Sequence, residues 1–159
     1  MGGGILPVAI VKGKLYFLFS REWNKSKDDP GKWSDFGGSR EKNETYKQTA
    51  VREGYEESSG FLGSKKNIKS LVENNLITSI TFNGYTTYIV LIKYDKTLPN
   101  RFRKKFTDTL KSKPSLVTNH NGLYEKDMAK WYSYDDMKKK FTSFRPWYRN
   151  IVKQILQNL

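Results

Sequence analysis

One segment of the chain, residues 38–60, limits the possible folds more than any other. It follows a short extended stretch that ends at Gly37-Gly38, and it contains no proline. Residues 44–58 include Glu, Gln, Lys and Ala, which favour helix. Asn43 is the expected N-cap and Gly60 the expected C′ residue, so the sequence predicts a helix over residues 44–58.

Three carboxylates crowd on one face of this predicted helix. At about 100° per residue, Glu53, Glu56 and Glu57 fall within an arc of roughly 100°. Like charges at such spacings destabilise a helix by about 0.2–0.5 kcal/mol per pair, so their crowding suggests a cation held between them. Carboxylate oxygens without His or Cys suit Mg²⁺ or Mn²⁺ rather than zinc. The alternative interpretation is an exposed, charged helix face.

The spacing of the whole segment resembles the signature of the Nudix hydrolases, G-x5-E-x7-R-E-U-x-E-E-x-G-U, in which U is an aliphatic residue. Six positions of fixed identity agree, and at average residue usage each agreement has a chance of roughly one in twenty, so coincidence is negligible. The matching residues are Gly38, Glu44, Arg52, Glu53, Glu56 and Glu57.

Two positions depart from the signature. Gly54 occupies the first aliphatic position, where a glycine costs about 1 kcal/mol inside a helix and implies close backbone packing beneath it. The closing Gly60-Phe61 falls one residue late, so the end of the helix is expected to differ while the acidic positions are kept.

The resemblance implies a fold, an activity and a set of site residues. The implied fold is α/β, the Nudix fold, in which a mixed β-sheet is sandwiched between α-helices (α/β/α). The implied activity is metal-dependent hydrolysis of a phosphoric anhydride. Carried over by position, Glu53 and Glu57 would bind the metal directly, Glu56 directly or through water, and the carbonyl of Gly38 would complete the set. The expected supporting residues are Arg52 and Glu44.

Nudix enzymes often use a further glutamate outside the signature as a metal ligand or base. The candidate here is Glu125, which follows the turn Asn121-Gly122 and precedes Trp131-Tyr132, similar to the late segment of the family. The alternative is a solvated loop carboxylate. His120, the only histidine, is interpreted as an exposed loop residue rather than a base.

The rest of the chain predicts one mixed α/β domain over residues 1–159, without repeats or a long linker. Lys12-Gly13 and Asn83-Gly84 are turn signals between apolar runs and predict two hairpins. The expected strands are residues 5–11, 15–19, 76–82, 85–92 and 128–134. The further expected helices are residues 64–75, 101–110 and 146–159, the last with Trp147, Ile151 and Ile155 on one stripe.

The net charge of +13 points to a polyanionic partner, although a basic surface that only aids solubility is the alternative. Lys104 and Lys105 lie in a basic stretch that suits an RNA backbone. Trp23, Trp33 and Tyr85 are loop aromatics that could stack on a purine or a methylated cap base, with core packing as the alternative for each.

The layout is also similar to the Nudix enzymes of large DNA viruses, some of which remove mRNA caps. Our hypothesis is therefore removal of the cap of RNA, releasing 7-methylguanosine diphosphate. The alternative enzyme is a diphosphoinositol polyphosphate, dinucleotide or nucleotide-sugar pyrophosphatase. An alternative of another class is a basic RNA-binding module with a degenerate Nudix fold.

Two absences narrow the classes of protein further. The chain has no cysteine, which excludes disulfides, thiolate metal sites and a cysteine nucleophile. It also lacks an apolar run of the roughly 20 residues that span a bilayer. We therefore expect no membrane partner and a cytoplasmic location, in the host cytoplasm if the protein is viral.

Overall fold

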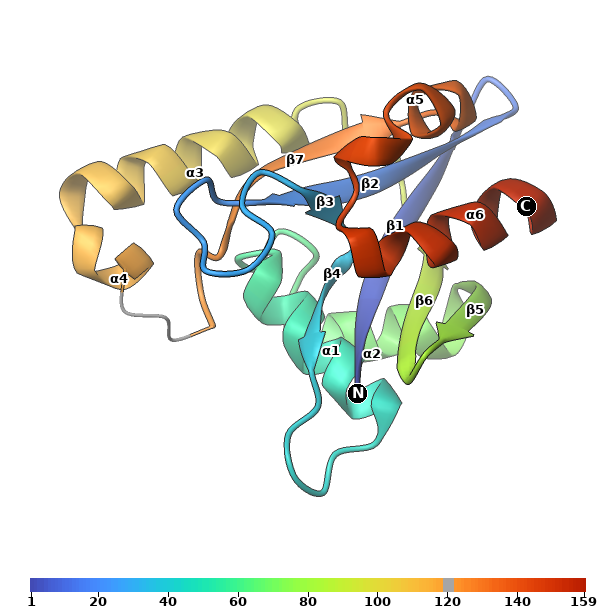
Figure 1. Ribbon diagram of the computed structural model, residues 1–159, viewed down its shortest axis with the longest axis horizontal. Coiled ribbons are helices and arrows are strands. Elements are labelled where there is room, and N and C mark those ends of the chain that lie inside the picture. The colour runs from blue at the N-terminus through green and yellow to red at the C-terminus, as the bar shows by residue number, and fades with distance from the viewer. Residues whose placement is uncertain (119–121) are drawn as a thin grey trace.

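The structure is a computed structural model that describes residues 1–118 and 122–159, so His120 and Asn121 lie outside the described residues. A seven-stranded sheet with the order β3-β2-β1-β6-β5 lies at its centre, with β4 paired to β1 and β7 paired to β2 (Figure 1). The strands are β1 (Gly2–Val11), β2 (Lys14–Glu22), β3 (Trp33–Ser34), β4 (Phe36–Ser39), β5 (Leu76–Phe82), β6 (Tyr85–Leu91) and β7 (Lys126–Tyr132).

Both predicted hairpins are present in this sheet. Lys12 and Gly13, between β1 and β2, have φ values of 50° and 78°, and Asn83 and Gly84, between β5 and β6, have values of 50° and 80°. Positive φ at both central residues is the geometry of a type I′ turn, whose twist matches that of the flanking strands. β1 and β6 run parallel to each other, and this pairing joins the two hairpins into one mixed sheet.

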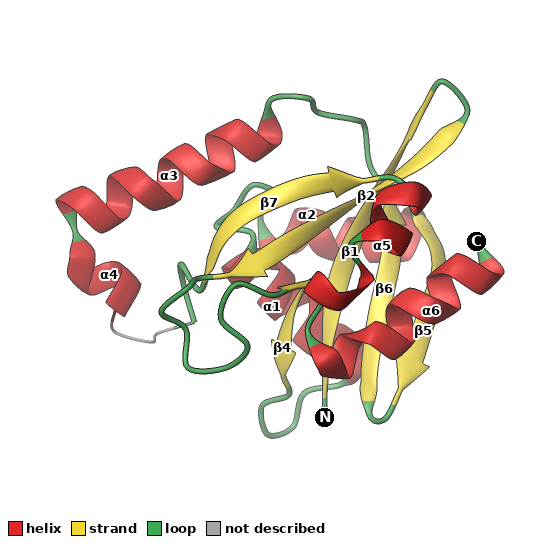
Figure 2. Ribbon diagram, turned by 45° about the horizontal axis from the view of Figure 1, so that its top comes forward, coloured by secondary structure: helices red, strands yellow, loops and turns green. Residues whose placement is uncertain are grey.

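Helices cover both faces of the sheet, with α5 and α6 on the near side in Figure 2 and α1 and α2 behind it. Phe17 and Phe19 of β2 pack in one core with residues of α6, whereas Leu18 packs in a second core with residues of α1 and α2. This alternation buries the sheet on both faces and confirms the expected α/β/α arrangement. The helices are α1 (Tyr46–Glu57), α2 (Lys65–Asn74), α3 (Leu98–Ser112), α4 (Pro114–Thr118), α5 (Tyr134–Lys139) and α6 (Arg149–Asn158), with 3-10 turns η1 (Phe141–Ser143) and η2 (Pro146–Tyr148). None of the helices within the described ranges is long and apolar enough to cross a membrane.

The closing helix differs from the prediction for residues 146–159. Pro146–Tyr148 forms a 3-10 turn, and α6 begins only after it. Ile151 and Ile155 are fully buried as expected, but Trp147 is 39% exposed, because the tighter turn takes it off their stripe. The prediction that Trp147 shares their buried face is therefore wrong.

The last strand and the basic helix are shifted relative to the sequence prediction. The strand expected over residues 128–134 begins two residues earlier and ends at Tyr132. Ser133 ends it, because its hydroxyl accepts a hydrogen bond from the N–H of Asp136 (3.1 Å) and caps α5. The basic helix expected over residues 101–110 extends by a few residues at both ends, as α3.

Gly54 lies within α1 and faces β1. A Cβ atom at this position would lie 2.7 Å from Cγ1 of Ile5, which is fully buried, so the expected close packing is confirmed. In Gly54→Ala, the higher helix propensity of alanine stabilises the fold by about 1 kcal/mol, whereas overpacking typically destabilises it by about 1–3 kcal/mol. Because Ile5 is fully buried and a Cγ1 atom is not the flexible end of a side chain, we expect urea denaturation to show a net loss of about 1 kcal/mol. A more stable variant would show that Ile5 moves aside freely.

Candidate active site

A cavity of about 620 Å³ lies between α1, β4 and the segment that precedes β7. Its walls include Glu53 and Glu57 of α1, Gly38 of β4 and Glu125 ahead of β7. The structure thus brings four residues that the sequence predicted as site residues to the same cavity, although they come from distant parts of the chain. Further charges in the wall come from Glu22, Lys27, Asp28 and Arg145.

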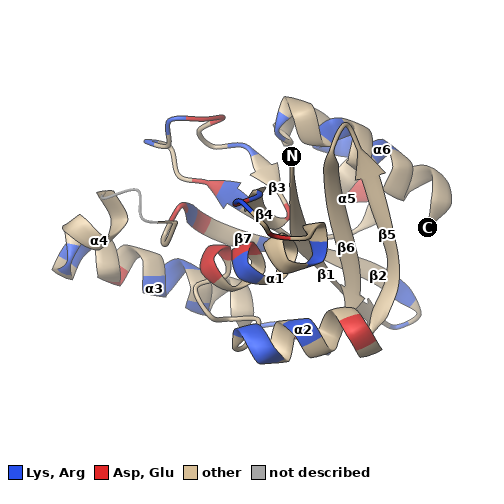
Figure 3. Cartoon of the chain, turned by 90° about the horizontal axis from the view of Figure 1, so that it is seen from below, with Lys and Arg blue, Asp and Glu red and all other residues tan. Residues whose placement is uncertain are grey.

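The cavity concentrates negative charge in a protein whose net charge is +13. Figure 3 shows Asp and Glu on α1 and beside the start of β7, whereas Lys and Arg dominate α2 and α3. Acidic side chains that gather in one cleft of a basic protein repel one another. This arrangement is costly unless a cation or a proton reduces the charge.

The N-terminus of α1 is fixed by Thr45 and not by Asn43. Asn43 has a φ of 68°, whereas Thr45 is extended, as an N-cap must be. The Thr45 hydroxyl accepts from the N–H of Gln48 (3.1 Å), and the Gln48 side chain accepts from the N–H of Thr45 (2.9 Å). This capping box leaves Glu44 outside the helix.

The C-terminus of α1 explains the late glycine of the signature. Ser59, with a φ of 51°, takes the C′ position that the sequence analysis assigned to Gly60. The N–H of Ser59 donates to the carbonyl of Glu56 (3.2 Å), and that of Gly60 donates to the carbonyl of Tyr55 (3.3 Å). This pair of bonds is a Schellman motif with a serine as its left-handed residue. The extra residue therefore lies beyond the acidic positions and leaves them in place.

Arg52 connects the acidic residues on the outer side of α1. Its guanidinium donates to both carboxylate oxygens of Glu44 (2.8 and 3.0 Å), to Glu53 (2.9 Å), to Glu56 (3.2 Å) and to the carbonyl of Ser39 (3.0 Å). Hydrogen bonding to Arg52 lowers the pKa of Glu44 to about 2. Glu44 reaches Arg52 because it lies before the helix instead of within it. The two expected supporting residues are thus in direct contact.

Glu53 lies against the backbone of Gly38. A Cβ atom at position 38 would lie 2.6 Å from Cδ of Glu53, so a larger residue would displace this carboxylate. The carbonyl oxygen of Gly38, the expected backbone ligand, lies beside Gly2. Burial raises the pKa of Glu53 to about 7, although the hydrogen bond from Arg52 acts in the opposite direction.

Glu57 is the most deeply buried acidic residue of the cavity. Its relative exposure is 3%, and its Oε2 atom has no hydrogen-bond partner. Burial raises the pKa of Glu57 well above its ordinary value; the charge of Lys126 opposes this rise, while Glu125 and Glu22 add to it. A buried carboxylate oxygen without a partner is costly, and a bound cation would satisfy it.

The donors of the cavity fit a hard divalent cation in kind, because all of them are oxygens. In the described part of the chain, however, no three acidic or histidine side chains are already arranged around one point. Arg52 holds Glu53 and Glu56 to one side, and Glu56 lies at the rim, next to Gly122. Cation binding would therefore require Glu53 and Glu56 to turn from Arg52 toward Glu57.

Three charged residues in and beneath the wall of this cavity were not predicted from the sequence. The side chain of Lys126 is fully buried, with Nζ 3.0 Å from the hydroxyl of Ser34 and 3.3 Å from the carboxylate of Glu22. Arg145 donates to the same carboxylate (2.5 Å). Fully buried lysines are rare, and nothing in the local sequence marks this one. These cations offset part of the negative charge around Glu57.

A second buried carboxylate, Asp35, lies behind the glycines of β4. It is fully buried and accepts hydrogen bonds from the hydroxyls of Tyr85 (2.7 Å) and Thr87 (2.8 Å). Burial raises the pKa of Asp35 from 3.8 to about 6. Because the folded state holds this proton more tightly than the unfolded chain, the contribution of Asp35 to stability is greatest below pH 3.8 and falls as the pH rises to about 6.

Asp35→Asn is expected to remove this pH dependence. The loss in the wild type is on the order of 3 kcal/mol, since one pKa unit corresponds to about 1.4 kcal/mol. Urea denaturation of both proteins between pH 4 and pH 8 should therefore show that the free energy of unfolding of the variant rises relative to that of the wild type up to about pH 6. Above about pH 6 the difference between the two free energies should be constant. A difference that does not change with pH would contradict the buried, protonated carboxyl.

Two of the aromatic residues predicted to bind substrate pack against other side chains of the protein. Trp33 is 7% exposed and packs in the core against Tyr132 (ring centroids 5.4 Å apart), so the prediction that it stacks on a base is wrong. Trp23 is half-buried and contacts Phe106 edge-on (5.8 Å). Tyr85 differs from both, because it lines a second cavity that adjoins the first.

The two predicted lysines lie on α3, and both have partners. Lys104 pairs with Asp108 one turn along the helix (2.5 Å) on an exposed surface. Lys105 donates to the carbonyl of Ser59 (2.7 Å) and so stabilises the C-terminus of α1. Lys105 therefore has a structural role that its sequence context did not indicate.

Similar architectures occur among solved structures. The chain resembles a Nudix hydrolase from M. smegmatis, RenU, with 16% identity and a TM-score of 0.51 over 98% of this chain and 83% of that chain. The chain has the Nudix fold. It is also similar to the C. elegans Ap4A hydrolase, with 14% identity and a TM-score of 0.51 over 97% of this chain and 91% of that one.

The highest of these TM-scores belongs to a larger protein. A bifunctional NMN adenylyltransferase/ADP ribose pyrophosphatase from Francisella tularensis, complexed with AMP and a Mn ion, has 17% identity and a TM-score of 0.56 over 98% of this chain and 41% of that chain. No protein-family model matches the sequence, and no curated protein matches it. At these low identities the likeness establishes the fold alone, and the predicted fold class is confirmed.

Proposed function

We propose that this protein is a hydrolase that uses Mg²⁺ or Mn²⁺ to cleave a phosphoric anhydride in a nucleoside diphosphate linked to another moiety. The observation that carries the proposal is Glu57, a buried carboxylate with an unpartnered oxygen beside Glu53 and Glu125 in a cavity of about 620 Å³. An RNA-binding module of the same fold would gain nothing from such crowded acids. We therefore favour the enzyme over the binding module.

The proposed mechanism assigns tasks to four carboxylates and to Arg52. A bound divalent cation would neutralise the phosphate oxygens and activate a water molecule for in-line attack. Glu53 and Glu57 would hold the cation directly, and Glu56 directly or through water. Arg52 holds the carboxylate of Glu53 until the cation replaces this contact. Glu125 accepts the proton of the attacking water or serves as a further ligand.

The fold neighbours and the surface beside the cavity support the proposed substrate class. The solved neighbours include proteins named as an Ap4A hydrolase and as an ADP ribose pyrophosphatase, and both Ap4A and ADP-ribose contain a phosphoric anhydride attached to a nucleoside. The cap of mRNA contains the same type of linkage. We propose capped RNA as the substrate, with 7-methylguanosine diphosphate as the product.

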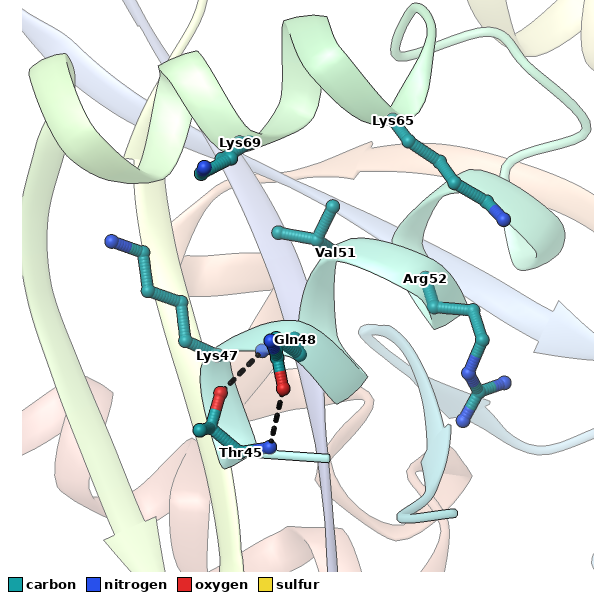
Figure 4. A pocket seen from close by; sticks show the side chains of 7 residues that line it. All are labelled: Thr45, Lys47, Gln48, Val51, Arg52, Lys65 and Lys69. Atoms are coloured by element: carbon teal, nitrogen blue, oxygen red, sulfur yellow. Dashed lines mark hydrogen bonds between the residues drawn. The ribbon is translucent and has the colours of Figure 1, made fainter. Parts of the chain in front are cut away.

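A basic groove beside the cavity supports an RNA partner. The groove has a volume of about 410 Å³ and lies between α1 and α2, where Lys47, Arg52, Lys65 and Lys69 line it (Figure 4). Glu73 lies 3.6 Å from Lys47 and 3.8 Å from Lys69, and both contacts are exposed and therefore weak. Arg52 belongs to the groove and to the acidic network, so an RNA strand that leaves the cavity past Arg52 would meet these lysines.

The lysines of the groove should affect long RNA and not a small cap analogue. In the double variant Lys65→Glu and Lys69→Glu, the slope of log K against log salt should become less steep by about 1–2, since each lost contact with single-stranded RNA changes it by about 0.7. Hydrolysis of a cap dinucleotide should be unchanged. Lys139→Glu on α5 is the matched control. Lys104→Glu, measured in the same series, tests the predicted contact of Lys104 with the RNA backbone. Equal losses on both substrates would place Lys65 and Lys69 outside an RNA path.

A panel of substrates tests the proposed specificity. The purified protein is incubated with Mg²⁺ and capped RNA, Ap4A, ADP-ribose or a diphosphoinositol polyphosphate, with Glu57→Gln as the control. The proposal expects release of 7-methylguanosine diphosphate from capped RNA at the highest kcat/KM. Faster cleavage of the diphosphoinositol would instead identify the basic groove as a site for a compact polyanion and overturn the capped-RNA assignment.

A further inference from the structure

A second cavity, with a volume of about 270 Å³, adjoins the acidic one. The two cavities share the backbone of Gly37, Gly38 and Ser39 and the side chain of Arg145. We infer that this second cavity is a nucleobase subsite, in which the planar ring of the substrate lies against Trp147. This inference rests on the proposed hydrolysis of a nucleotide anhydride, and it favours nucleotides over diphosphoinositols.

Trp147 is the residue that distinguishes this cavity. It is one of the few large hydrophobic side chains that the fold leaves exposed (39%), and it lines the cavity wall. Its ring is held on two sides, by Tyr85 (ring centroids 4.7 Å apart) and by the guanidinium of Arg145 (5.1 Å from the ring centroid). An exposed aromatic ring that is already fixed in place loses little entropy when a base stacks on it.

The part of the wall formed by Tyr85 is rigid for a separate reason. Tyr85 donates its hydroxyl to the fully buried Asp35 (2.7 Å), so its ring cannot swing out of the wall. A Cβ atom at Gly37 would collide with this hydroxyl, so the glycine leaves the space in which Tyr85 is anchored. The backbone of Asn83-Gly84 completes the wall with polar groups that can meet the edge of a base.

Arg145 joins this subsite to the acidic cavity. Its guanidinium is bonded to Glu22 (2.5 Å) and Asp29 (3.0 Å), which fixes it between the two spaces. A nucleotide with its base against Trp147 would pass its phosphates over Gly38 toward Glu53, which lies against that glycine. An aromatic space that continues into a polar one thus suits the base and the phosphates of a nucleoside diphosphate.

Binding of two ligands that lack an anhydride tests the subsite independently of hydrolysis. In isothermal titration with Mg²⁺ present, AMP should bind the wild type roughly tenfold or more tightly than ribose 5-phosphate, because only AMP carries a base that can stack. Trp147→Ala should abolish this preference, and Trp147→Phe should keep most of it and show that the fold is intact. Trp23→Ala, which removes an aromatic ring outside the cavity, should leave it unchanged.

Equal binding of AMP and ribose 5-phosphate to the wild type would overturn the inference, as would an unchanged preference in Trp147→Ala. A preference that depends on Trp147 in a protein without anhydride hydrolysis would support the subsite and count against the proposed function. Hydrolysis of nucleotide anhydrides by the wild type, together with normal AMP binding in Trp147→Ala, would contradict the subsite and leave the proposed function in place.

Discussion

Glu57→Gln is expected to lower turnover by roughly two or more orders of magnitude while the protein stays folded. The substitution keeps the shape of the side chain but removes the charge that would hold the cation, and each 1.4 kcal/mol of lost transition-state stabilisation costs a factor of ten. Because Glu57 is buried with an unpartnered oxygen, the neutral amide should not destabilise the fold. Steady-state kinetics and thermal melts of the same preparations measure both effects.

Two further variants are measured beside Glu57→Gln, one in the same cavity and one as a control. Glu53→Gln should behave like Glu57→Gln, because both carboxylates line the cavity. Glu73→Gln is the matched control, since Glu73 has only exposed contacts with Lys47 and Lys69. Near-normal turnover in Glu53→Gln or Glu57→Gln, with a melting profile like that of the wild type, would remove that residue from the proposed site.

Glu125→Gln is expected to lower turnover by about 10²- to 10⁴-fold if Glu125 is the base, with little change in substrate affinity. Glu125 lines the acidic cavity, and it contributes to the raised pKa of Glu57, so the two carboxyls are neighbours. The structure thus favours a site residue over a solvated loop carboxylate at this position.

The response to Mn²⁺ separates the two roles of Glu125. Loss of a ligand weakens binding of the cation, so high Mn²⁺ should restore part of the activity of Glu125→Gln. Loss of a base leaves the cation in place, so Mn²⁺ should have no effect. Turnover within about threefold of the wild type at every Mn²⁺ concentration would exclude both roles, because a base alone typically contributes about 10²-fold or more.

The acidic site was predictable because its residues lie in one segment with a fixed spacing. The contact between Arg52 and Glu44 was harder to predict, because helical geometry places the two residues far apart when Glu44 is counted within the helix. Thr45 and Gln48 form a capping box that shortens the helix, and this pattern was present in the sequence. The left-handed backbone conformation of Ser59 could not be predicted, because a serine with positive φ has no strong sequence signal.

The residues outside that segment depended on three-dimensional contacts. Trp33 looked like a loop aromatic, but the pairing of β3 with β2 buries it in the core. Trp147 fitted a helical stripe, yet Pro146 opens a 3-10 turn and leaves the ring exposed. Lys126 is buried because Glu22 and Ser34, more than 90 residues earlier in the sequence, surround its amino group. Periodicity describes single elements and cannot report such contacts.

Hydrolysis in water labelled with ¹⁸O tests the central claim most directly. A cap dinucleotide is incubated with the wild type and Mg²⁺, and mass spectrometry follows the oxygen that enters the products. We expect one ¹⁸O atom in a phosphate group of one product per turnover, no reaction in EDTA, recovery when Mg²⁺ is restored, and a large loss of rate in Glu57→Gln. Absence of labelled phosphate product with either Mg²⁺ or Mn²⁺, on this substrate and on Ap4A and ADP-ribose, would contradict the central claim.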